Sequence, residues 1–95
     1  MAVVELIRFY GKQNDLEDMV SILSNSGDLE KIQKESGCIY FDFYYPAGST
    51  DQLLLAEKWE RNEKLELHHG TEMMANLLSL IEKYSFRLSA EKYDV

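Results

Sequence analysis

The segment 38–45 limits what this chain can fold into more than any other part of the sequence. It reads Cys-Ile-Tyr-Phe-Asp-Phe-Tyr-Tyr, and this density of β-branched and aromatic residues predicts a strand. Because side chains alternate along a strand, we expect two apolar faces, one with Ile39, Phe41, Phe43 and Tyr45 and the other with Cys38, Tyr40, Asp42 and Tyr44. Both faces need cover, and a chain of 95 residues has little material to supply it.

The rest of the chain alternates between strand-like and helix-like patterns. The turn residues of 46–51 join the strand at 38–45 to a second strand as a hairpin. The strands predicted besides 38–45 are 3–10, 52–60 and a more polar edge strand at 85–93. The predicted helices are one capped by Asn14 or Asp15, a further piece around Leu29 and Ile32, a short one at 62–69 capped by Asn62, and one beginning at Thr71 and running to Tyr84.

This order, βαββαβ, predicts an α+β, ferredoxin-like domain that spans residues 1–95. Right-handed crossovers would place the helices on one face of a four-stranded antiparallel sheet. The other face would then expose more apolar surface than monomers usually tolerate. We therefore expect a homodimer in which a second sheet covers this face.

Charge and composition exclude several classes of protein. Seventeen acidic and ten basic residues give a net charge of −7, which disfavours nucleic acid and anionic membrane surfaces as partners. No apolar run reaches the length of a membrane span, and the first residues lack the basic segment of a signal peptide. The single cysteine excludes an internal disulfide framework and any multi-cysteine zinc site. We expect a cytoplasmic protein without metal.

Glu57 and Trp59 form the first pair that could carry chemistry. Alternation places Glu57 on the same strand face as Leu53, Leu55 and Trp59. A carboxylate on an apolar face is costly unless it is paired or protonated. The simplest interpretation is an ion pair with Arg8 or Arg87 across the sheet, with Trp59 filling the core.

His68 and His69 form the second candidate. Leu65 and His68 are three residues apart on the predicted helix, so they share a face, and His69 lies about 100° further round, towards solvent. An inward His68 could act as a general acid or base near neutral pH. The alternative is a hydrogen-bonded core histidine without a catalytic role.

Three short motifs together resemble the antibiotic biosynthesis monooxygenase family. They are Glu35-x-Gly37-Cys38, Glu57-x-Trp59 and Leu65-x-x-His68-x-x-Thr71, and the resemblance covers roughly residues 3–90. It implies a dimeric α/β barrel with a pocket between the sheet and the helices of each subunit. It also implies oxidation of a quinol or phenol by O2 without flavin, haem or metal, so no cofactor is expected.

The resemblance also implies the site residues. His68 would be the catalytic residue, and the substrate would contact Trp59, Glu57, Leu55, Leu65, Met73 and Leu77. The chain departs from the branch of the family that oxidises polyketides, because Leu55, Leu65 and Ser79 replace its polar groups. Leu78 stands where the haem-degrading branch has its haem-ligating histidine, which disfavours haem degradation.

Three functions follow from this sequence. The first is a cofactor-independent monooxygenase that oxidises a small quinol or phenolic substrate. The second is an isomerase or lyase that acts on a small carbonyl or signal metabolite with His68 as the base. The third is a non-catalytic dimeric ligand-binding module. A phosphorylated substrate would need Arg8, Arg61 or Arg87 in the pocket, since these are the only arginines.

Overall fold

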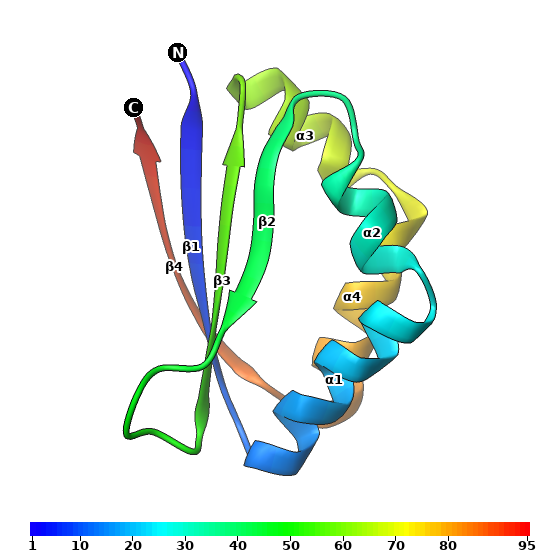
Figure 1. Cartoon of the computed structure of the whole chain (residues 1–95), viewed down its shortest axis with the longest axis vertical. Helices are drawn as coiled ribbons and strands as arrows, with labels where there is room; N and C mark the ends of the chain where they lie inside the picture. Colours follow the sequence, from blue (N-terminus) through cyan, green and yellow to red (C-terminus); the bar gives the residue numbers. More distant parts are fainter.

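The computed structural model describes all residues from 1 to 95. Along the chain the elements are β1 (Val3–Tyr10), α1 (Gln13–Asn25), α2 (Asp28–Gln33), β2 (Cys38–Tyr44), β3 (Gln52–Trp59), α3 (Asn62–His69), α4 (Glu72–Tyr84) and β4 (Arg87–Asp94) (Figure 1). The strands form one antiparallel sheet in the order β2-β3-β1-β4. All four helices lie on one side of this sheet, as Figure 1 shows. The predicted ferredoxin-like α+β fold is confirmed.

The strand β3 shows how the sequence pattern positions the core. Its buried residues are Leu53, Leu55, Glu57 and Trp59, and the residues between them are partly exposed. Its buried face points to the helices, since Leu16 of α1, Leu65 of α3 and Leu77 of α4 belong to the same core. The phase predicted for this strand is therefore correct. It carries Glu57 and Trp59 into the layer between the sheet and the helices.

The phase predicted for β2 is wrong at its first residues. Cys38 pairs with Trp59, but Tyr40 pairs with Lys58, so Ile39 is an extra residue in a β-bulge. The bulge places Cys38 beside the core, together with Phe41, and leaves Ile39 50% exposed. A strict two-residue alternation could not show this shift.

The helix ends depend on short local signals. The hydroxyl of Thr71 caps α4 by accepting the backbone N–H of Met74, at the residue where the sequence predicts that the helix begins. Neither Asn14 nor Asp15 caps α1, because the helix already begins at Gln13 and has no side-chain cap. Asn62 is likewise inside α3 and not its cap.

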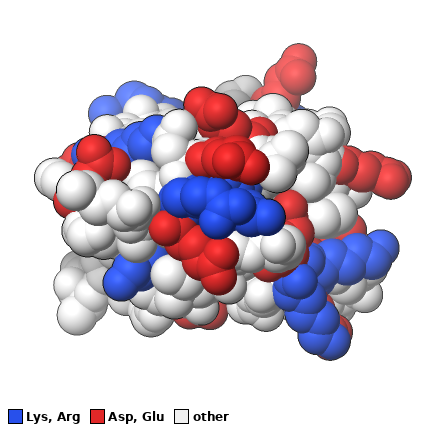
Figure 2. Space-filling view, turned by 90° about the horizontal axis from the view of Figure 1, so that it is seen from above, with Lys and Arg blue, Asp and Glu red and all other residues white.

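The surface carries charges of both signs close together. Figure 2 shows Lys and Arg side chains interspersed with Asp and Glu on the face seen from above, without a continuous basic patch. On this face the arrangement agrees with the expectation drawn from the net charge. None of the helices has the length and apolar character that a bilayer-spanning helix requires.

Candidate functional site

A small cavity lies between the sheet and the helices α3 and α4. It has a volume of about 50 Å³. Nine of the thirteen residues that line it are hydrophobic. The polar exceptions are two carboxylates, Glu5 and Glu57, and two histidines, His68 and His69. Of the three buried polar or charged residues of the chain, two, Glu57 and His68, line this cavity.

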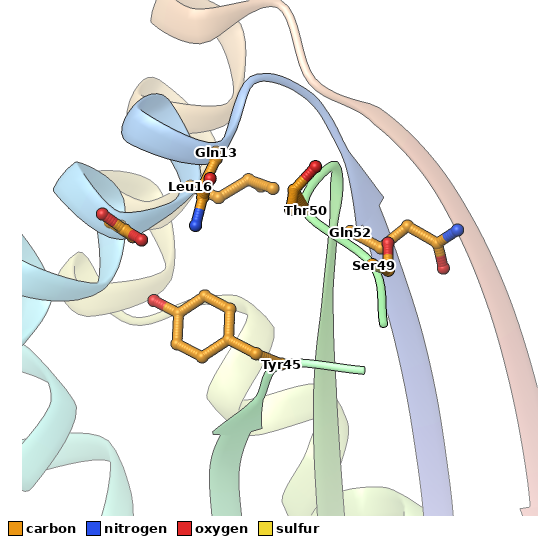
Figure 3. A pocket seen from close by; sticks show the side chains of 7 residues that line it. Gln13, Leu16, Tyr45, Ser49, Thr50 and Gln52 are labelled. Carbon is orange, nitrogen blue, oxygen red and sulfur yellow. The ribbon is translucent and has the colours of Figure 1, made fainter. Parts of the chain in front are cut away.

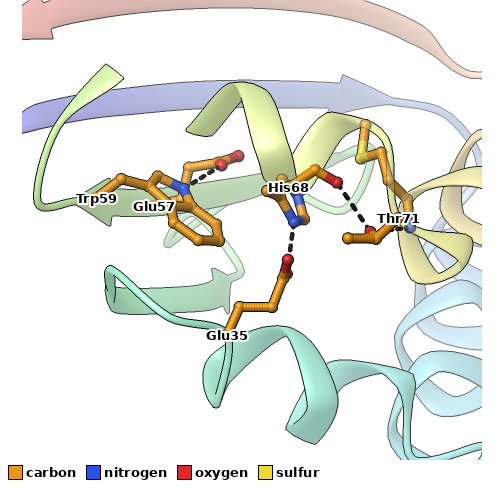
Figure 4. A network of polar contacts seen from close by, with 6 residues as sticks. Glu35, Glu57, Trp59, His68 and Thr71 are labelled. Carbon is orange, nitrogen blue, oxygen red and sulfur yellow. Dashed lines mark hydrogen bonds and ion pairs between the residues drawn. The ribbon is translucent and has the colours of Figure 1, made fainter. Parts of the chain in front are cut away.

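His68 is held in one orientation by a carboxylate. Its side chain is 1% exposed, and its Nδ1 lies 2.7 Å from Oε2 of Glu35, which lies just before β2 (Figure 4). Because a carboxylate only accepts hydrogen bonds, Nδ1 carries the proton and Nε2 keeps its lone pair. Burial lowers the pKa of His68, and the Glu35 carboxylate opposes part of this effect. The imidazole is therefore neutral at neutral pH, with Nε2 as a base.

Aromatic rings and a backbone contact fix the His68 ring further. Its centroid lies 4.8 Å from that of Trp59 and 5.6 Å from that of Phe41. The hydroxyl of Thr71 donates to the carbonyl of His68 at 2.8 Å while it caps α4. The junction between α3 and α4 thus holds the main chain of His68, and the core rings hold its side chain.

Glu57 is a buried carboxyl without a cation beside it. Its side chain is 2% exposed, and its Oε1 accepts the indole N–H of Trp59 at 2.8 Å (Figure 4). Its cross-strand neighbour on β1 is another acid, Glu5. Burial raises the pKa of Glu57 to about 7, and the nearby carboxylates of Glu5 and Glu35 add to this rise. Near neutral pH this carboxyl is protonated in a large fraction of the molecules.

The ion pair expected between Glu57 and Arg8 or Arg87 does not exist. Arg8 donates to Oε1 of Gln52, and the guanidinium of Arg87 lies 4.1 Å from the centroid of the Tyr10 ring. Both arginines alternate out of phase with the inward residues of their strands, so they lie on the sheet face without helices. The expectation failed because the phase of β1 and β4 decides which residues can meet Glu57.

The structure brings only part of the predicted site together. His68, Glu57, Leu55 and Leu77 line the cavity. Trp59 and Leu65 are buried but do not border the cavity. Met73 packs against the core outside the cavity, and its neighbour Met74 lines the cavity instead. His69 is exposed, as expected, yet it also borders the cavity, with its ring centroid 5.8 Å from that of His68.

Sequence reasoning missed two acidic residues of this site. Glu5 shares the inward phase of Val3 and Phe9 on β1, and this alternation could have identified it. Glu35 is part of the first motif, but nothing in its spacing from His68 predicts their contact. Burial raises the pKa of the Cys38 thiol to about 11, which keeps it in the unreactive thiol form near neutral pH.

A second cleft lies at the other end of the molecule. It has a volume of about 270 Å³ and lies between the first turns of α1 and the loop from β2 to β3 (Figure 3). The side chains of Gln13, Leu16 and Tyr45 point towards one another there. Leu16 is its only buried residue, and no buried titratable group faces it. This cleft offers polar contacts but no arrangement for acid or base chemistry.

Comparisons with known proteins show the fold of the chain. No protein-family model matches it, and no curated protein matches it. A Bacteroides thetaiotaomicron protein of unknown function, described as a possible oxidoreductase, has a TM-score of 0.86 and 19% identity over 99% of this chain and 97% of its own. A Nitrosomonas europaea protein, provisionally named an antibiotic biosynthesis monooxygenase, has a TM-score of 0.85 and 15% identity over 99% and 89%.

A third structure carries the same family name. It is called an antibiotic biosynthesis monooxygenase and has a TM-score of 0.81 and 20% identity over 100% of this chain and 98% of its own. This chain shares the fold of these proteins. The agreement is consistent with the family resemblance of the three motifs. Sequence identities this low show that the chain has this fold, but they do not identify its substrate.

Proposed function

We propose that this chain is a monooxygenase that oxidises a small uncharged phenol or quinol with O2. The observation that carries the proposal is the hydrogen-bonded pair of Glu35 and the buried His68, which lines an apolar cavity and has Nε2 free. A neutral imidazole is suited to take the hydroxyl proton of a phenol, and the apolar lining excludes water from the anion that forms. The names of the structural neighbours support a monooxygenase in general terms.

The proposed reaction converts a phenol and O2 into a quinone and water. His68 takes the hydroxyl proton, and a ring carbon of the phenolate forms a bond to one oxygen of O2. His68 returns the proton to the peroxide anion, which gives a ring hydroperoxide. Cleavage of the O–O bond, with loss of the proton on that ring carbon, leaves a carbonyl and releases water. O2 accepts four electrons, and the two protons lost by the phenol end in the water.

The volume of the cavity requires that its lining moves when a ring binds. An engineered protein cavity that binds benzene has a volume of about 150 Å³, so a cavity of about 50 Å³ is too small for a phenol. The side chains of Met74 and Leu78 on α4 border it, and both are partly or largely exposed. Methionine has flexible torsions and adapts to irregular space. Entry of substrate is expected between α4 and the inner face of β4.

The charge of the lining limits the substrate. No arginine and no lysine borders the cavity, so Arg8, Arg61 and Arg87 all lie outside its lining. Phosphate and carboxylate groups would therefore meet Glu5 and Glu57 without a compensating cation. This disfavours a phosphorylated metabolite as the substrate of any enzyme that uses this cavity.

An isomerase for an uncharged hydroxy-carbonyl compound is the second candidate. The observation that favours it is the presence of a base, His68, and an acid, Glu57, on the same cavity. Such a pair can move a proton between two carbons through an enol. This reaction consumes no O2, so oxygen dependence separates the two candidates.

The deciding experiment measures oxygen uptake with a panel of hydroquinones and phenols, with and without the protein. A monooxygenase consumes one O2 for each quinone formed, and labelled O2 places one labelled oxygen in the product. Conversion that continues without O2 would favour the isomerase. No conversion of any neutral phenol or quinol would refute the proposal.

A further inference from the structure

The carboxyl of Glu57 has one oxygen free to meet a ligand. Oε1 accepts the Trp59 indole N–H, and this is the only hydrogen bond of the side chain. No buried side-chain oxygen or nitrogen of the chain lacks a partner. Oε2 must therefore be accessible, and the space that Glu57 borders is the cavity. The same reasoning applies to Nε2 of His68, whose Nδ1 is occupied by Glu35.

The groups around Glu57 favour its protonated form. On β1 it faces Glu5, on α3 it shares the cavity with His68 and His69, and Glu35 lies behind His68. The β2 residue opposite it is Phe41, and α4 contributes only apolar side chains to the cavity. Lys92 of β4 is the cross-strand neighbour of Glu5, and its ammonium group donates a hydrogen bond to the side-chain oxygen of Asn62. No salt bridge involves Glu57, so a proton is what neutralises it.

We propose that Glu57 binds substrate as a protonated carboxyl that donates a hydrogen bond from Oε2, so that the site selects rings with two oxygens. One oxygen is the hydroxyl that faces Nε2 of His68, and the other accepts the hydrogen bond from Glu57. Hydroquinones and hydroxy-carbonyl rings have both oxygens. Phenols with one oxygen can make only one of the two hydrogen bonds. This inference rests on the proposed function only in taking the cavity as the substrate site.

Trp59 acts as the positioning residue of this pair. Its N–H holds one oxygen of Glu57, and its ring packs against the His68 ring at a centroid distance of 4.8 Å. One side chain therefore sets the orientation of both the donor and the base. This explains a buried tryptophan that does not itself border the cavity.

The test is calorimetric binding without O2, comparing 4-methoxyphenol, whose ether oxygen can only accept a hydrogen bond, with 4-ethylphenol, which is similar in size but has one oxygen. Below neutral pH the wild-type protein is expected to bind 4-methoxyphenol about tenfold or more tightly than 4-ethylphenol, because an unpaired polar group in the site is costly. As the pH rises through about 7, binding of 4-methoxyphenol weakens up to about tenfold per pH unit and takes up close to one proton from the buffer.

Glu57→Gln is the decisive variant. Its amide oxygen can accept the Trp59 N–H, and its amide NH2 donates to the ligand at every pH. Preference for 4-methoxyphenol should persist in this variant, but its pH dependence and proton uptake should vanish. Glu5→Gln is the matched control, since it removes the neighbouring carboxylate and leaves the titration of Glu57 in place, moved to lower pH.

Three results would overturn the inference. They are equal binding of the two phenols, a wild-type preference that does not change with pH, and a Glu57→Gln variant that follows the wild-type pH curve. Binding behaviour as expected, with no oxygen uptake, would refute the monooxygenase and leave this inference standing. Thermal unfolding of each variant establishes that it is folded.

Discussion

At the scale of single residues, the pair of His68 and Glu35 is the first target for mutation. His68→Ala removes the proposed base and should lower turnover by about 10²–10⁴-fold. Glu35→Gln keeps a hydrogen-bond acceptor for Nδ1 but removes the negative charge, so it should lower kcat with little change in KM. Oxygen uptake measures both effects. Glu66→Gln, at an exposed position on α3, is the control. If His68→Ala lowers only the melting temperature of the protein, His68 is a structural histidine.

Glu57 should make the folded protein less stable as pH rises. Its pKa is about 7 in the folded state and 4.5 without the fold. Between these values the folded state holds more protons than the unfolded state, so the free energy of unfolding falls as pH rises from 4.5 to about 7. A difference of this size corresponds to about 3 kcal/mol.

Glu57→Gln should abolish this loss. Relative to wild type, the variant should gain about 2–3 kcal/mol of stability above pH 7 and little at about pH 4. His68 has the opposite effect on the pH dependence. Because its pKa is lowered in the folded state, its contribution to the free energy of unfolding falls as pH drops below 6.5. Urea unfolding of both proteins across this range isolates the Glu57 contribution. A difference in stability that is the same at every pH would contradict the prediction.

At the scale of elements, the junction between α3 and α4 links helix capping to the site. Thr71 caps α4 and donates to the His68 carbonyl, so one hydroxyl serves both helices. Thr71→Ala should cost about 1 kcal/mol of unfolding free energy from the lost cap. It should also lower turnover, because the main chain of His68 loses a contact. Thr71→Ser retains the hydroxyl and should restore both. A stable, fully active Thr71→Ala protein would show that the junction does not position His68.

At the scale of the whole molecule, the sheet face without helices is the surface through which we expect a homodimer. Its residues include Val4, Leu6, Tyr10, Tyr40, Leu54 and Ala56, all at least partly exposed in the isolated chain. Light scattering at micromolar concentration should give about twice the chain mass of 11.1 kDa. A monomer at that concentration would contradict the expectation.

Leu6→Lys tests which face forms the dimer. Leu6 pairs with Ala56 on one side and Glu91 on the other, so a lysine there has an acid beside it and the folded monomer is preserved. In the dimer the same lysine would be buried in an apolar interface and should separate the subunits. Ser21→Lys, at an exposed position on α1 on the other side of the sheet, is the control. A Leu6→Lys protein that remains dimeric would place the interface elsewhere.

Local patterns were sufficient to predict the elements and much of the core. The alternation along β3 predicted that Leu55, Glu57 and Trp59 share one buried face. The helical spacing of Leu65 and His68 predicted that both point inward, and both are buried. The beginning of α4 at Thr71 was also predicted. Each of these features depends on residues within one turn or one strand, where periodicity and capping are governed by nearby atoms.

Contacts between elements were decided by the tertiary structure alone. Glu35 and His68 are 33 residues apart, and their contact depends on how α3 sits against the end of α2. Glu57 faces Glu5, not an arginine, because the register of β1 against β3 sets that pair. The bulge at Ile39 shifted one residue of β2 to the opposite face. Outside the bulge of β2, the sequence by itself determined which side chains turn inward, because that follows from the local period. Register, bulges and helix placement determined which of those side chains meet, because these depend on the packing of the whole chain.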